Sequence, residues 1–410
     1  MTEYELHTLP NGIRVAHRQM THTKVVHCGF VLDIGSRDER PNQHGLAHFW
    51  EHMAFKGTQK RRAYHIINRL EAVGGELNAY TTKEKICFYA SLLDRHFETA
   101  LELLTDITFD SVFPEKQIER ERNVILEEMA MYYDSPEDAI QDDLDQVIFG
   151  EHPLGKNILG SRDSIRTFHR ADFQRFLAEH MNTERLVFCC VGNLPMKQVV
   201  KLTEKYLSNI PALHGPGHRL PFGAYVPQQK TVKRPLTQAQ CALGRTAFPV
   251  HDPRSLPFFM LTNLLGGPGM NSRLNLALRE KHGLVYSADA EYHSYTDTGF
   301  FAIYFGTEPA QLGRARGYVM KELRTLREKP LGKLQLHRLK EQLMGQLAMS
   351  SENNQSLMLA IGRSMLEERE LDSLDTVYRK INAVAASDLQ EIAQEMFQET
   401  ALSTLAYVPE

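Results

Sequence analysis

Short runs of alternating hydrophobic and polar residues mark the first half of the chain. Between Val25 and Ile34 the apolar side chains fall on one face of an extended segment, which predicts a strand. Similar runs predict further strands at 12–15, 76–81, 86–92 and 186–191. Helical spacing of apolar residues predicts helices at 45–55, 63–73, 94–108, 114–133, 136–148 and 164–181.

The second half of the chain repeats this succession of patterns. Strands are predicted at 241–248, 285–292, 300–305 and 403–408. Helices are predicted at 254–265, 271–281, 309–327, 332–349, 355–367 and 376–396. The chain thus contains the same order of elements twice: a strand, helices, two strands, helices and a strand. We therefore expect an α+β fold of two similar domains, each a mostly antiparallel sheet covered by helices.

A stretch rich in proline and glycine separates the two halves. It contains Pro211, Gly215, Pro216, Gly217, Pro221, Gly223 and Pro227. Such residues interrupt regular structure and are typical of linkers. The sequence therefore predicts a first domain over 1–210, a linker over 211–228 and a second domain over 229–410.

Charge and composition exclude several classes of partner. The net charge is -4 and the pI is about 6.5, so no basic footprint for nucleic acid and no polybasic membrane patch is expected. No apolar run reaches the roughly 18 residues of a membrane span, and the polar start does not resemble a signal peptide. The five cysteines form no CxxC pair and suggest reduced core thiols. We expect a cytoplasmic location.

The sequence His48-Phe49-Trp50-Glu51-His52 carries the strongest chemical signal. On a helix the two histidines stand at i and i+4, so their imidazoles can reach one metal ion. Glu51 lies near the same face, where it can take a proton from a water bound to zinc. This HxxEH order is a zinc peptidase signature. The alternative is a helix on which histidines stack without any metal.

A catalytic zinc site needs a third protein ligand from another element. Candidates on the predicted helix at 114–133 are Glu119, Glu121, Glu127 and Glu128. Glu121 and Glu128 are seven residues apart, about two helical turns, and so share a face. Spacing alone is equally compatible with a solvated charged face.

At these residues the chain resembles the pitrilysin and insulinase family of zinc peptidases, in its short form similar to the mitochondrial processing peptidase. The resemblance extends over nearly the whole chain, including Leu9 to Gly12, Gly35 to Glu39 and His44 to Thr58. It implies that Glu128, in Val124-Ile125-Leu126-Glu127-Glu128, is the third zinc ligand. It also implies that Glu121 orients a ligand from outside the metal shell.

Two further segments match the family. Gly74 to Thr81 resembles its substrate-binding edge strand, which would bring Asn78, Ala79 and Tyr80 to the peptide through main-chain hydrogen bonds. Arg279 and Tyr286 match a pair that binds the peptide carbonyl and its oxyanion. Without the resemblance, the segment from Gly74 to Thr81 would be interpreted as an ordinary hairpin strand. Arg279 and Tyr286 would be interpreted as surface residues.

The sequence therefore predicts a zinc endopeptidase that binds one zinc ion per chain and acts on peptides or unstructured segments. Relatives enclose the substrate between two halves of two domains each, which implies that this chain forms a homodimer. One alternative is a non-catalytic peptide-binding subunit of a related complex. Another is a structural zinc protein, although a closed structural site has no use for the base Glu51.

Overall fold

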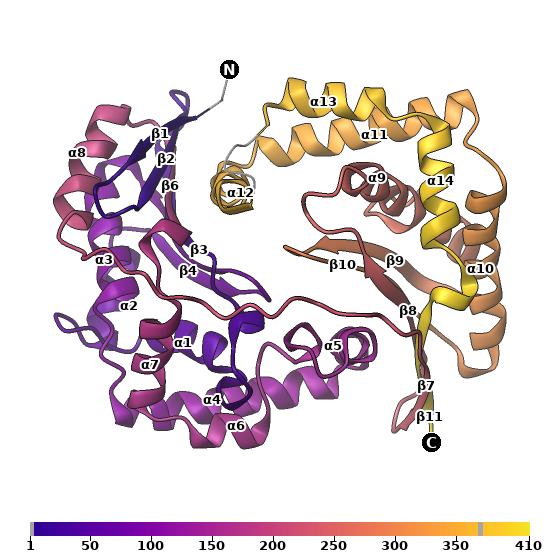
Figure 1. The fold of residues 1–410 in the computed structure, drawn as a ribbon, viewed down its shortest axis with the longest axis horizontal. Helices are drawn as coiled ribbons and strands as arrows, with labels where there is room; N and C mark the ends of the chain where they lie inside the picture. The colour runs from indigo at the N-terminus through magenta and orange to yellow at the C-terminus, as the bar shows by residue number, and fades with distance from the viewer. Residues whose placement is uncertain (1–3, 368–371) are drawn as a thin grey trace. The chain divides into compact units, whose positions relative to one another are not determined.

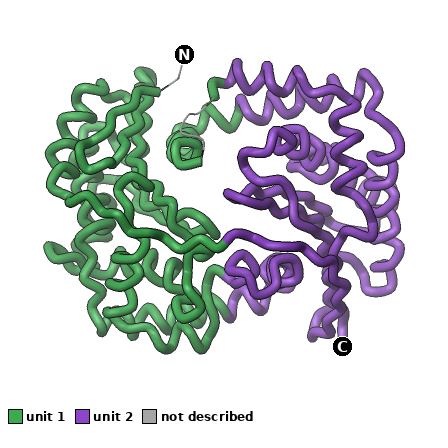
Figure 2. The backbone as a smooth tube through the Cα atoms, viewed as in Figure 1, with its two compact units in different colours: residues 1–129, 158–220, 349–373 green, residues 130–157, 221–348, 374–410 purple. Residues whose placement is uncertain are grey.

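The chain folds into two compact units, seen in a computed structural model that describes residues 4–367 and 372–410 (Figure 1). Unit 1 draws its described residues from 1–129, 158–220 and 349–373. Unit 2 draws them from 130–157, 221–348 and 374–410 (Figure 2). Each unit is built around one sheet.

The sheet of unit 1 has six strands in the order β1-β2-β6-β3-β5-β4. Its strands are β1 (Glu5–Thr8), β2 (Arg14–Gln19), β3 (Val25–Leu32), β4 (Glu76–Thr81), β5 (Ile86–Leu93) and β6 (Leu186–Gly192). All neighbouring pairs are antiparallel except β2 and β6. β4 ends the order, so one of its edges has no partner strand in this sheet.

Helices cover both faces of this sheet. Those of unit 1 are α1 (Leu46–Ala54), α2 (Ala63–Glu71), α3 (Phe97–Phe109), most of α4 (Glu115–Asp134), α6 (Arg162–Thr167), α7 (Arg170–His180), α8 (Met196–Leu207) and α12 (Asn354–Glu367). The larger core lies between one sheet face and helices such as α1, α3 and α7. A smaller core lies beneath α12, on the opposite face.

The sheet of unit 2 has five strands in the order β7-β11-β8-β10-β9. They are β7 (Gln229–Arg234), β8 (Ala239–Ala247), β9 (Val285–Ser294), β10 (Gly299–Thr307) and β11 (Ser403–Pro409). Its helices are α5 (Pro136–Phe149), α9 (Ser255–Gly266), α10 (Leu312–Glu328), most of α11 (Lys333–Ser351), α13 (Leu374–Ala383) and α14 (Ala386–Met396). Only β7 and β11 run parallel.

The two sheets repeat one topology. The order β2-β6-β3-β5-β4 corresponds strand by strand to β7-β11-β8-β10-β9, and the single parallel pair has the same position in both. The expected α+β fold of two similar domains with mostly antiparallel sheets is confirmed.

The two halves of the chain exchange one helix each. α12, from the second half, packs on β6 and β3 of unit 1, while α5, from the first half, packs on the equivalent strands β11 and β8 of unit 2. The predicted domain boundaries at 210 and 229 divide the chain into continuous segments, whereas each compact unit combines several separate segments. These boundaries therefore stay predictions. Residues 211–228 contain no helix or strand, apart from one bridge between Asn182 and His214.

Several predicted elements differ from the structure. The helix expected over 164–181 is wrong: α6 ends at Thr167, and α7 starts anew after His169, whose backbone N–H is capped by Asp172. The helix expected over 376–396 is likewise divided into α13 and α14. The 271–281 helix is a π-helical turn at Asn275–Glu280. The sequence patterns also missed β1, α8 and β7.

Candidate metal centre

Helix α1 presents two different faces. Phe49 and Trp50 are fully buried, and the Trp50 ring packs edge-on against Phe88 of β5 at 5.5 Å between ring centroids. This anchoring of one face in the core turns His48 and His52 to the other. The two imidazoles lie 4.7 Å apart between centroids, as expected for one helical turn.

The start of α1 is fixed by the buried side chain of Glu39. Gly45, just before the helix, has φ of +92°, a left-handed conformation that glycine adopts without strain. A Cβ at this position would lie 2.7 Å from the Leu159 carbonyl oxygen. The Glu39 side chain accepts hydrogen bonds from the N–H groups of Gly45 at 2.9 Å and Ala47 at 2.7 Å. These two bonds satisfy N–H groups at the start of the helix that have no partner within it.

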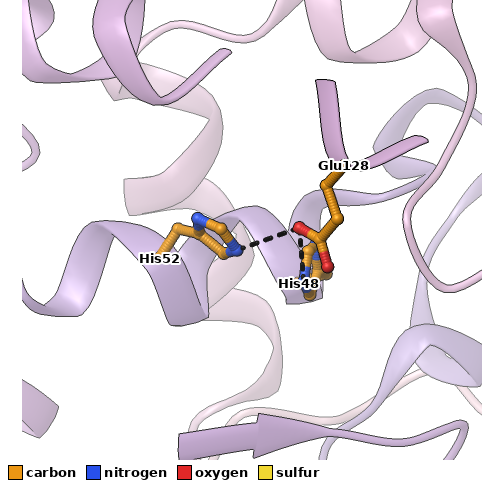
Figure 3. Close-up of side chains that lie close together, drawn as sticks. All are labelled: His48, His52 and Glu128. Atoms are coloured by element: carbon orange, nitrogen blue, oxygen red, sulfur yellow. Dashed lines mark ion pairs between the residues drawn. The ribbon is translucent and has the colours of Figure 1, made fainter. Parts of the chain in front are cut away.

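Helix α4 supplies the acidic side chains. Its buried face includes Ile118, Glu121 and Ile125, and Glu128 continues this face one turn further along. Figure 3 shows Glu128 reaching from α4 toward His48 and His52 on α1. Glu127, by contrast, is exposed.

Three side chains converge on one point. Glu128 Oε2 lies 3.5 Å from His52 Nε2 and 3.8 Å from His48 Nε2. One ligand atom from each residue lies within 4.8 Å of the others, and among the described residues this is the group able to hold a metal ion. Ligands about 2.1 Å from a tetrahedral zinc ion lie roughly 3.4 Å apart, so these side chains fit zinc. Two imidazoles and one carboxylate are a donor set of catalytic zinc sites.

The two histidines differ in their electrostatic surroundings. Burial and the nearby His52 lower the pKa of His48 to about 4, so this imidazole is neutral and ready to bind a metal. Burial also lowers the pKa of His52, but its hydrogen bonds to Glu121 and Glu128 outweigh burial and raise it to about 9. The pKa of His52 therefore depends on its carboxylate neighbours. A metal ion that binds this imidazole has to displace its proton.

Glu51 lies on α1 next to His52 in the sequence and interacts electrostatically with His52 and Glu128. Its carboxylate accepts a 2.6 Å hydrogen bond from the hydroxyl of Thr81, the last residue of β4. Burial raises the pKa of Glu51 above its usual value, and the Thr81 hydrogen bond opposes this shift. A carboxylate with a raised pKa is better suited to accept and return a proton near neutral pH.

Strand β4 carries the three residues predicted to bind substrate. Its free edge can accept another extended chain through main-chain hydrogen bonds. Side chains alternate along it, so Ala79 packs against the core below the sheet and Asn78 and Tyr80 point to the other face. In this sheet β4 pairs with β5 alone, so the main-chain N–H and C=O groups along its other edge have no partner strand there.

Arg279 and Tyr286 lie close together in unit 2. The Arg279 guanidinium is 5.5 Å from the centroid of the Tyr286 ring. Tyr286, near the start of the edge strand β9, is 86% exposed, so its hydroxyl is open to a ligand. The three converging residues His48, His52 and Glu128 belong to unit 1, whereas Arg279 and Tyr286 belong to unit 2.

Two matching helix-covered sheets, with two histidines one turn apart and a glutamate from a second helix, are typical of a class of peptidases that use zinc. The chain belongs to one family of this class, the insulinase family, also called peptidase family M16. Residues 14–162 match the family described as insulinase (peptidase family M16). Residues 167–343 match the peptidase M16 inactive domain.

Relatives of similar length share about a third of their sequence with the chain. A protein named uncharacterized zinc protease YmxG, from Bacillus subtilis, is 33% identical over 96% of this chain and 95% of its own. A protein named uncharacterized zinc protease SCO5738, from Streptomyces coelicolor, is 32% identical over 95% of this chain and 86% of its own.

Solved structures share the fold. A protease from Helicobacter pylori superposes with a TM-score of 0.92 at 22% identity and covers 100% of both chains. A peptidase M16 inactive domain from Pseudomonas fluorescens superposes with a TM-score of 0.90 at 18% identity, over 99% of this chain and 98% of its own. Among the described residues, no helix is long and apolar enough to cross a membrane.

Sequence patterns missed two residues that shape the centre, Thr81 and Glu39. Thr81 ends a predicted strand and carried no chemical signal of its own. Glu39 lies in a family-like segment, but no spacing rule connects it to the start of α1. Both act through contacts made only in the folded chain.

Proposed function

We propose that the chain is a zinc-dependent endopeptidase that hydrolyses peptides or unstructured polypeptide segments. The convergence of His48, His52 and Glu128, with Glu51 beside them, is the observation that carries this proposal. The names of the relatives, which are zinc proteases, support it. We assign one zinc ion to each chain.

The proposed roles follow from the positions of the side chains. When bound, zinc would polarise the peptide carbonyl and lower the pKa of water to around 7. Glu51 accepts a proton as the water oxygen bonds to the carbonyl carbon, and it returns this proton to the amine when the C–N bond breaks. The edge of β4 aligns the peptide, while Arg279 and Tyr286 donate hydrogen bonds to the oxyanion.

We further propose that two copies of the chain enclose the substrate in one chamber. A single chain contributes one zinc motif and one Arg/Tyr pair, which gives a homodimer two complete sets. Excluding water from such a chamber strengthens the electrostatic interactions made with the substrate.

The competing proposal is a non-catalytic, peptide-binding subunit of a related complex. One preparation tests both: zinc is counted by metal analysis and turnover is measured on a quenched peptide. We expect about one zinc per chain and measurable cleavage, and Glu51→Gln should keep the zinc but lose nearly all turnover. A wild-type protein that binds peptide and cleaves none would favour the alternative. Loss of zinc in Glu51→Gln would refute the role of Glu51.

A further inference from the structure

The hydroxyl of Thr81 makes a short hydrogen bond to the catalytic base assigned above. Thr81 Oγ1 lies 2.6 Å from Glu51 Oε2. Bonds from a hydroxyl to an ionised carboxylate are typically about 2.5–2.7 Å long and stronger than neutral ones. Within the described part of the chain, no other side chain donates a hydrogen bond to Glu51.

The geometry of β4 directs Thr81 toward α1. Residues two apart on a strand share a face, so Thr81 lies on the side of Leu77 and Ala79, which pack against the core that includes α1. Asn78 and Tyr80 lie on the other side. A shift of one residue in the register of β4 would remove the hydroxyl from Glu51.

The backbone around Thr81 is held on both sides. Thr81 pairs with Ile86 of β5 at the end of the hairpin. In the turn that follows, the Thr82 N–H donates to the Lys85 carbonyl at 2.7 Å, and Lys85 N–H donates to Thr82 Oγ1 at 2.9 Å. Thr81 is therefore a fixed donor, whereas the long Glu51 side chain needs something to restrict its rotation.

We propose that Thr81 is a positioning residue for the peptidase reaction. Its hydroxyl holds Oε2 of Glu51 and so leaves Oε1 to accept the proton of the attacking water. Because Thr81 stands on the strand whose edge receives the peptide, it fixes the distance between the base and the substrate backbone. This inference rests on the proposed function.

Two substitutions separate the hydroxyl from the shape of the side chain. Thr81→Val keeps the branched shape that suits a strand but removes the donor, and Thr81→Ser keeps the donor. Thr105→Val is the matched control, since the Thr105 hydroxyl donates only to the Leu101 carbonyl within its own helix, at 2.8 Å. For each variant, kcat, KM, zinc content and a crystal structure are required.

For Thr81→Val we expect kcat to fall about 10- to 100-fold, the effect of losing a hydrogen bond to a charged group. KM and zinc content should stay near the wild-type values, because the strand edge and the metal ligands are untouched. In its crystal structure the Glu51 carboxylate should leave its place. Thr81→Ser and Thr105→Val should stay within about threefold of wild type in kcat.

Three results would overturn the inference. They are an unchanged kcat in Thr81→Val, an unmoved Glu51 carboxylate in its crystal structure, and a Thr81→Ser protein as impaired as Thr81→Val. If the wild-type protein cleaves no peptide, the proposed function fails. The position of Glu51 in the Thr81→Val and Thr81→Ser crystals still decides whether Thr81 positions it.

Discussion

The Glu121 carboxylate accepts a hydrogen bond from Nδ1 of His52 at 3.3 Å, while Nε2 of the same ring faces Glu128. Glu121 is buried and is itself held by Lys56 Nζ at 2.8 Å. A carboxylate behind a metal-binding imidazole fixes the tautomer and the direction of the ring. Glu121 thus determines which nitrogen of His52 is offered to a metal.

Removing the Glu121 charge should weaken zinc binding without removing a ligand. We expect Glu121→Gln to lower zinc affinity about 10- to 100-fold, measured by competition with a chelator. The control is Glu119→Gln on the same helix, where an exposed glutamate pairs with Arg122. Equal affinities for the two variants would contradict the role given to Glu121.

The third ligand can be tested against its neighbour in the sequence. The Glu128 carboxylate lies close to the imidazoles of both histidines, whereas Glu127 is exposed to solvent. Glu128→Gln should therefore reduce zinc affinity by more than about 100-fold, and Glu127→Gln should leave it within about threefold. Titration of both variants with a chelator shows which of them binds zinc more weakly. The reverse order would transfer the ligand role to Glu127.

The buried Glu39 should make stability depend on pH. Burial raises its pKa from 4.5 to about 8, although hydrogen bonds from Ala47 and Gly45 and the charge of Lys83 oppose the shift and Asp38 adds to it. A group with a raised folded-state pKa stabilises the fold fully below its unfolded pKa, and this contribution is lost as the pH rises through 8. Glu39→Gln removes this dependence.

The measurement is urea unfolding of the metal-free wild-type and Glu39→Gln proteins at several pH values from 5 to 8.5. The wild-type free energy of unfolding should fall relative to that of the variant by several kcal/mol across this range. Other titrating groups contribute to both proteins and cancel in the difference. A difference that does not change with pH would show that Glu39 keeps one protonation state throughout.

Mixing experiments test whether Arg279 and Tyr286 complete the site of another subunit. Glu51→Gln and Tyr286→Phe homodimers should each be nearly inactive. If the pair acts in trans, a mixed dimer has one site with both defects and one with neither, and it recovers up to half of the wild-type activity. Action in cis leaves one defect in each site and gives no recovery. A fully active monomer would refute the trans arrangement.

The sequence alone was enough to pick out the candidate ligands on α1, because the spacing that a metal site requires there is local. His48, Glu51 and His52 lie within one turn of helix, and the bounds predicted for β4, 76–81, agree with the structure. The choice of Glu128 among the glutamates of α4 needed the family resemblance, because helical spacing shows which residues of one helix share a face but not which face meets another helix. Burial of Glu121 and exposure of Glu127 now separate them by their surroundings.

Features that depend on distant parts of the chain could not be predicted. Thr81 is 30 residues from Glu51 and of a common residue type. The breaks after Thr167 and Ala383 were missed because the apolar spacing continues across them, although Asp172 and Asp388 cap the helices that follow. The exchange of α5 and α12 leaves no trace in periodicity, because an apolar helix face does not specify which sheet it covers.

The position of α12 in unit 1 has a consequence for synthesis of the protein. Met365 accepts hydrogen bonds at its sulfur from Tyr4 and at its carbonyl oxygen from Arg14, contacts that span 361 and 351 residues of sequence. While the ribosome is still making the second half, the β3 and β6 face beneath α12 has no cover from its own helix. Such long-range closure slows folding and leaves apolar strands open to aggregation. The unit that carries His48, His52 and Glu128 is therefore among the first parts of the chain to be translated and among the last to complete its fold.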